Sequence, residues 1–138
     1  MGIKKIELNA VRNNVNGFME FIESYLETLP IDPQIIPSIM ISCEEIIVNV
    51  VNYAYQNKEG NLSIEIETTS KEIKIVFSDS GIPFNPLEIK EVDTSLPLQE
   101  REIGGLGIHM VKKLMDDVKY EYKENKNCLT IVKQILTE

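Results

Sequence analysis

Apolar and polar residues alternate in two different rhythms along the chain, and each rhythm predicts a different element. A period of two predicts a half-buried strand, whereas steps of three and four residues predict a helix with one apolar face. Residues 3–8, 61–69 and 72–79 alternate with a period of two, so we expect three strands there. Apolar residues recur at helical steps over 10–29, which predicts a helix with Asn9 as its N-cap.

Prolines and a long aperiodic segment separate the remaining elements. A second helix is expected over about 34–56, because prolines precede it and it is apolar on most of its circumference. No period is visible over 81–103, and so long a loop in a compact domain is often a functional lid. A third helix is expected over about 105–116, followed by strands over 117–124 and 128–136.

The order of these elements predicts the fold class. Strand, helix, helix, strand, strand, loop, helix, strand and strand follow one another, and the last two strand pairs have the short connections of hairpins. We therefore expect an α+β fold, a two-layer α/β sandwich with one mostly antiparallel sheet and helices on one face. At 138 residues the chain is long enough for one core, so residues 1–138 are expected to form a single domain.

Composition narrows the classes of function. The net charge is −8 and no cluster of basic residues exceeds two, so direct binding of nucleic acid is not expected. No run of eighteen apolar residues predicts a membrane span, and residues 1–10 lack the apolar core of a signal peptide. Cys43 and Cys128 have no metal-ligand or CxxC spacing. We expect both to be buried, reduced thiols of a cytoplasmic protein.

A polar stripe interrupts the otherwise apolar second helix. With Glu45 at zero on a helical wheel, Asn49 falls at roughly 40° and Asn52 at roughly −20°. The stripe has two interpretations. It could face solvent, as charged side chains usually do. Alternatively it could point into a cleft, where a carboxylate can act as a general base and amide oxygen can bind Mg²⁺.

A short polar segment, SDSGIPFNP over 78–86, directly follows the predicted strand 72–79. Asp79 could accept a hydrogen bond from an exocyclic amine, and Gly81 would let a flat ring approach the backbone. The alternative is a plain turn, because Asp-Ser-Gly is a common turn tripeptide.

Three glycines within four residues, Gly104, Gly105 and Gly107, open the third predicted helix. They form neither a Walker A loop nor a dinucleotide-binding fingerprint, because the spacing and the preceding element do not fit. The segment is either a helix-entry turn or an anion site, where free backbone N–H groups meet the positive end of the helix dipole.

The order of these three motifs resembles that of a known superfamily. It is the order of the Bergerat ATP-binding fold of the GHKL superfamily, which includes gyrase, MutL, the heat-shock chaperone and histidine kinases. Within that superfamily the chain is most similar to the bacterial anti-sigma factor serine/threonine kinases. The similarity lies in ExxxN followed by YAY, in DSGIPFNP and in GGLGIHMVKKLMDDV, with a closing strand that contains LTIVK. It extends over nearly the whole chain.

The resemblance implies a role for each site residue. Glu45 would be the catalytic base, with Glu44 as its competitor, and Asn49 would be the Mg²⁺ ligand. Asp79 would bind the adenine amine. The remaining roles concern adenine binding by Gly81 and Thr130, an ATP lid over residues 87–103, phosphate binding by Gly104, Gly105, Leu106 and Gly107, and a contact of Arg101 with the γ-phosphate.

The resemblance also implies a function. A chain of this kind would bind ATP and Mg²⁺, phosphorylate an anti-sigma factor antagonist and silence a sigma factor by partner switching, usually as a homodimer. Two alternatives remain: an ATP-binding regulator without kinase activity, and a protein-interaction domain that binds no ATP. His109 is assigned a structural or exposed position, because histidine kinases carry their phosphorylated histidine on a separate domain.

Overall fold

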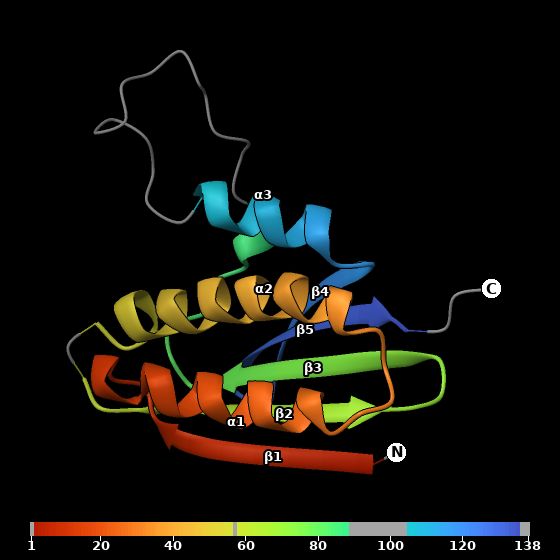
Figure 1. Cartoon of the computed structure of the whole chain (residues 1–138). Coiled ribbons are helices and arrows are strands. Elements are labelled where there is room, and N and C mark those ends of the chain that lie inside the picture. Colours follow the sequence, from red (N-terminus) through yellow and green to blue (C-terminus); the bar gives the residue numbers. More distant parts are fainter. Residues whose placement is uncertain (1, 57, 89–104, 136–138) are drawn as a thin grey trace.

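The fold is built on a five-stranded sheet in the order β1-β2-β3-β5-β4, with every neighbouring pair antiparallel (Figure 1). The computed structural model describes residues 2–56, 58–88 and 105–135. The strands are β1 Gly2–Asn9, β2 Asn61–Thr68, β3 Glu72–Asp79, β4 Asp117–Lys123 and β5 Lys126–Gln134.

Helices cover one face of the sheet, which confirms the two-layer α+β sandwich (Figure 1). The α2 helix passes directly into a turn of π-helix, and short 3₁₀ turns precede α1 and α2 and follow β3. The helices are α1 Val15–Glu27, α2 Ile36–Asn49 and α3 Gly105–Leu114, the π-helix is Val50–Ala54, and the 3₁₀ turns are Arg12–Asn14, Pro33–Ile35 and Pro86–Glu88.

The core lies between the helices and the sheet, where alternate strand residues meet the apolar helix faces. In β2 and β3 every second side chain is buried, and the helices contribute Phe18, Ile22 and Leu26 from α1 and Ile39 and Ile47 from α2. Each such side chain stabilises the fold by about 1.5–3 kcal/mol relative to an exposed one. The period-two pattern of the sequence therefore reports burial on one face of the sheet.

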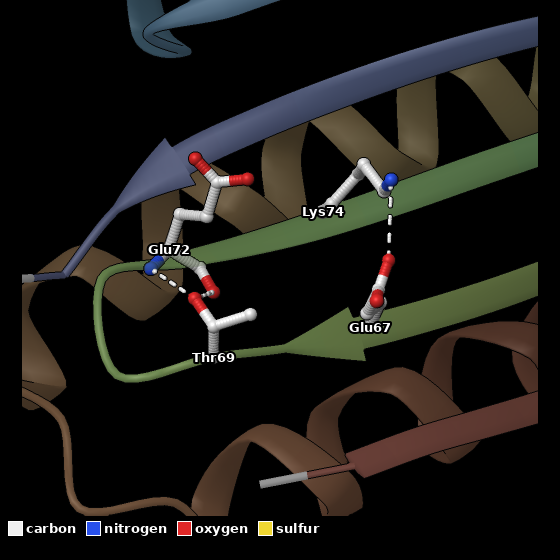
Figure 2. A network of polar contacts seen from close by, with 4 residues as sticks. All are labelled: Glu67, Thr69, Glu72 and Lys74. Carbon is white, nitrogen blue, oxygen red and sulfur yellow. Dashed lines mark hydrogen bonds and ion pairs between the residues drawn. The ribbon is translucent and has the colours of Figure 1, made fainter.

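The other face of the sheet carries polar side chains, and Figure 2 shows one ion pair on it together with the adjoining hairpin. Lys74 Nζ lies 3.1 Å from Glu67 Oε1, and these residues are register partners in β2 and β3. At the β2–β3 hairpin, Thr69 Oγ1 accepts hydrogen bonds from the backbone N–H groups of Lys71 and Glu72, at 3.1 and 3.2 Å. The side chain of Thr69 thus stabilises the turn that joins β2 to β3.

Several sequence expectations about the elements were wrong in detail. Asn9 is the last residue of β1 rather than a helix N-cap, and its carbonyl accepts a hydrogen bond from Asn14 Nδ2 at 2.9 Å. The chain enters α1 through the 3₁₀ turn instead. Cys43 is buried, and burial raises the pKa of its thiol, but Cys128 is half-buried on the outer sheet face.

The helical segment Pro33–Ala54 is long and apolar enough to cross a membrane, by length and composition alone. In this structure its buried side chains belong to the core beneath the helix layer, and α1 and α3 pack against it. The same composition is expected of a core helix.

Candidate functional site

A cavity of about 310 Å³ lies between the π-helix at the end of α2 and the sheet. Asn49 of α2 and Asp79, the last residue of β3, both line it, whereas Glu45, the carboxylate of the predicted stripe, is not among the described residues that line it. The rest of its lining is mostly apolar, which suits a flat ring system. Its lining includes Ile46, Asn49, Val50, Asn52, Phe77, Asp79, Ile82, Phe84, Ile108, Tyr120, Asn127 and Leu129.

Asp79 lines this cavity and is held by one of its two carboxylate oxygens. Oδ1 accepts hydrogen bonds from Gly81 N at 2.9 Å and from Asn127 Nδ2 at 3.0 Å. Among the described residues no hydrogen bond reaches Oδ2. Burial raises the pKa of Asp79, while the donors from Asn127 and Gly81 oppose that shift. The carboxylate thus keeps one oxygen for a ligand donor.

Gly81 lies directly against the backbone of the π-helix. A Cβ atom built at Gly81 would overlap the carbonyl oxygen of Ala54. That same carbonyl oxygen accepts a hydrogen bond from Ile82 N at 3.0 Å. The absent side chain therefore lets the segment after β3 dock on the end of the second helix, where π-helical geometry frees a carbonyl from the regular ladder.

Tyr55, the last residue of the YAY motif, joins the same two segments. Its hydroxyl accepts a hydrogen bond from Ser80 N at 2.8 Å and donates one to Asn61 O at 2.6 Å. Its ring fills the space that a Cβ at Gly60 would take. This tyrosine thereby fixes the Asp79 segment to the start of β2.

Glu45 and Asn49 lie one turn apart on α2, as the helical wheel predicted. Asn49 lines the cavity, and Glu45 is half-buried beside the first turn of α3. A Cβ built at Gly107 would overlap the Glu45 carboxylate, so α3 approaches this carboxylate where a side chain is missing. Burial raises the pKa of Glu45 and the Glu44 carboxylate adds to this, while the Asn49 amide opposes it.

The glycine segment is described in part. Gly105, Leu106 and Gly107 form the first turn of α3, which places Gly107 beside Glu45. Gly104 and Arg101 lie outside the described residues, as does the predicted lid except for Leu87 and Glu88 in the 3₁₀ turn.

The expectation that Thr130 joins Asp79 was wrong. In β5 Asn127, Leu129 and Ile131 are directed toward the core, so Thr130 lies on the opposite face of the sheet. There it lines a second hollow that also includes Glu72, Lys74 and Lys119. The structure instead places Asn127 beside Asp79, its register partner.

Two other polar residues from the sequence analysis, Asn52 and His109, are also described by the structure. Asn52 is exposed at the cavity wall, and half-buried His109 lies within α3. Within residues 2–56, 58–88 and 105–135, no group of three or more His, Cys, Asp or Glu side chains could hold a metal ion.

Comparison with known proteins identifies the family. Residues 8–133 match the family model of the histidine kinase-like ATPase domain. The chain belongs to this family. This ATPase domain is 27% identical over 135 residues to the anti-sigma F factor of Clostridium kluyveri, covering 95% of the chain and 92% of that protein. It is also 27% identical over 124 residues to the serine-protein kinase RsbW of Oceanobacillus iheyensis, covering 86% and 70% of the two chains.

A solved structure agrees with these relatives in fold. The crystal structure of the RsbU and RsbW domains of Rv1364c from Mycobacterium tuberculosis superposes with a TM-score of 0.71 at 13% identity. The match covers the whole of this ATPase domain and 34% of that longer chain. The resemblance to anti-sigma factor kinases predicted from the motifs is therefore confirmed at the level of family and fold.

Proposed function

We propose that this chain is an ATP-dependent protein kinase that phosphorylates a serine or threonine of an anti-sigma factor antagonist. The observation that carries the proposal is the position of Gly107 against the Glu45 carboxylate. It joins the glycine-rich helix start, a phosphate-binding feature, to a carboxylate that can accept a proton.

The purine end of the cavity supports ATP as the substrate. Asp79 offers Oδ2 as an acceptor for the 6-amino group of adenine, and apolar side chains such as Phe77 and Ile108 line the walls. The family description, an ATPase domain, agrees with this assignment.

The proposed reaction needs one proton acceptor from the chain. The substrate hydroxyl oxygen attacks the γ-phosphorus, the bond from that phosphorus to the bridging oxygen of ADP breaks, and Glu45 takes the hydroxyl proton. The raised pKa of Glu45 makes it a stronger base than an ordinary glutamate. Glu44, at the preceding helical position, is exposed and is not among the atoms nearest to a Cβ at Gly107.

The donor set beside Glu45 fits Mg²⁺ in part. An asparagine amide oxygen is a hard ligand, and Mg²⁺ usually keeps few protein ligands and takes the rest from phosphates and water. Asn49 would hold the ion, which would neutralise charge on the transferred phosphoryl group.

The names of the relatives support the finer parts of the proposal. One is called an anti-sigma F factor and others are called serine-protein kinases. We infer that this chain silences a sigma factor and releases it by partner switching, as a cytoplasmic homodimer.

The test compares two neighbouring glutamates. Glu45→Ala should retain ATP binding in calorimetry but lose phosphoryl transfer to the antagonist encoded nearby by about 10²–10⁴-fold. Glu44→Ala is the matched control, with transfer close to that of the unmodified protein. Equal loss in both variants, or full transfer in Glu45→Ala, would reject Glu45 as the base.

The same experiment separates the alternatives. ATP binding without transfer by the unmodified protein would favour the ATP-dependent regulator. Absence of ATP binding would leave the interaction domain as the remaining interpretation.

A further inference from the structure

The side chain of Asn127 lies at the junction of three segments beside the cavity. It extends from the start of β5, where its register partner is Asp79, and only 7% of the residue is exposed. It also contacts the segment after Gly81 and the hydroxyl of Tyr120 on β4. A buried amide in this position needs partners for all of its polar atoms.

Every hydrogen-bonding position of the Asn127 amide is filled by the protein itself. Nδ2 donates to Asp79 Oδ1 at 3.0 Å and to Ile82 O at 2.9 Å, with Gly81 O further away at 3.5 Å. Oδ1 accepts from Phe84 N at 3.1 Å and from the Tyr120 hydroxyl. An amide with two donor and two acceptor positions has none left for a ligand.

The surroundings also fix which way the amide points. Rotating it by half a turn would bring its oxygen against the Asp79 carboxylate and the Ile82 carbonyl, where acceptors would face acceptors. The nitrogen would then face the Phe84 N–H, donor against donor. The chemistry of the neighbours therefore sets the orientation.

The consequence falls on Asp79. With Gly81 N and Asn127 Nδ2 both donating to Oδ1, the carboxylate is held with Oδ2 as its remaining acceptor. An acceptor selects a purine that carries an amino group at position 6, because the amine donates a hydrogen bond that an unsubstituted ring carbon does not. We propose that Asn127 is a positioning residue that gives the site its preference for 6-aminopurines, acting through Asp79. This inference rests on the proposed function, binding of ATP in this cavity.

The experiment compares two ligands and two variants by calorimetry on the full chain. The ligands are ATP and purine riboside triphosphate, which lacks the 6-amino group. Asn127→Asp keeps the shape and the acceptor oxygens but replaces the donor with a second carboxylate. Asn125→Asp, an exposed change in the turn before β5 where φ is 62°, adds the same charge without reaching Asp79.

The unmodified protein should bind ATP about ten- to a hundredfold more tightly than the analogue, and Asn125→Asp should keep that ratio. Asn127→Asp should bring the ratio of the two affinities close to one, mainly by weakening the binding of ATP. Equal weakening of both ligands, with the ratio kept, would overturn the proposal and leave Asn127 a purely structural role. A ratio near one in the unmodified protein would overturn it as well.

A second pair of variants covers the case in which Asn127→Asp does not fold. Tyr120→Phe removes the hydroxyl that donates to Asn127 Oδ1, whereas Tyr122→Phe removes an exposed one on the same strand. The ligand ratio should fall in the first variant and remain in the second, and an unchanged ratio in both would count against the proposal. If the unmodified protein binds neither ligand, the proposed function fails instead.

Discussion

Two glycines near the cavity, Gly81 after β3 and Gly107 in α3, serve different purposes. At the end of β3, Gly81 brings one backbone segment against another, and two hydrogen bonds, from Gly81 N and Asn127 Nδ2, hold the Asp79 carboxylate. In the first turn of α3, Gly107 makes room for the carboxylate of Glu45. A new side chain at Gly81 would meet backbone, which cannot move locally, whereas one at Gly107 would meet the end of a flexible side chain, which can swing aside. A substitution at Gly81 should therefore lower mainly the stability of the protein, and one at Gly107 mainly the rate of phosphoryl transfer.

The largest effect is expected from Gly81→Ala. The new Cβ would overlap the Ala54 carbonyl oxygen, and because both partners are backbone, a whole segment must move. We expect a loss of about 3 kcal/mol or more in the free energy of unfolding, measured by chemical denaturation, together with weaker ATP binding.

The control for this prediction is Gly17→Ala in α1. A Cβ there would lie 3.6 Å from Leu8 Cδ1, an ordinary contact, so the helix should gain about 0.5–1 kcal/mol. Comparable stability of the two variants would show that the segment after β3 is not tightly docked on the π-helix.

A smaller effect on stability but a clear one on catalysis is expected from Gly107→Ala. The Glu45 carboxylate is the far end of a flexible side chain, so it can swing aside at a cost of less than about 1 kcal/mol in unfolding free energy. Displacing it should slow phosphoryl transfer by about ten- to a hundredfold, since a small misplacement of a catalytic group is costly. If Gly107→Ala transfers phosphoryl groups at the rate of the unmodified protein, Glu45 does not act in the phosphoryl-transfer step.

The fold was predictable because hydrophobic periodicity reports burial directly. The alternation of Ile64 and Ile66 in β2, and of Ile73 and Ile75 in β3, matches the buried positions of both strands. The polar stripe was predictable for the same reason, because Asn49 departs from the apolar pattern of α2 and lines the cavity. By contrast the Asn9 N-cap depended on a local preference, and the 3₁₀ turn after β1 displaced it.

The sequence-based prediction missed Asn127 as the partner of Asp79, because it did not consider which residues of β5 share one face of the sheet. Asn125 and Asn127 are both turn-forming types, and the turn does contain Asn125 at φ 62°. Asn127 is already in β5, two residues before buried Leu129, so it shares the core-facing side. Thr130 has the opposite parity. Counting back from the apolar residues of the closing strand would have indicated Asn127, whereas the π-helix that receives Gly81 has no comparable signal.

The smallest effect concerns the charge of Glu45 and its influence on stability. Because burial raises its pKa, the folded protein favours the protonated form, and the stability associated with that form is present at low pH. It is lost as pH rises through the raised pKa. Glu45→Gln removes this titration while keeping the shape, so the variant should be more stable than the unmodified protein at pH 7 and equally stable below the ordinary glutamate range of about pH 4.

Thermal unfolding across pH would measure this difference, with Glu44→Gln as the control for loss of one negative charge on the same helix. The control should change stability less at neutral pH, because Glu44 is exposed and carries no comparable desolvation cost. If Glu45→Gln is more stable than the unmodified protein but no longer transfers phosphoryl groups, the protein keeps its catalytic base at a cost in stability. A variant less stable at pH 7 would instead indicate that the ionised carboxylate is held by favourable contacts with the first turn of α3.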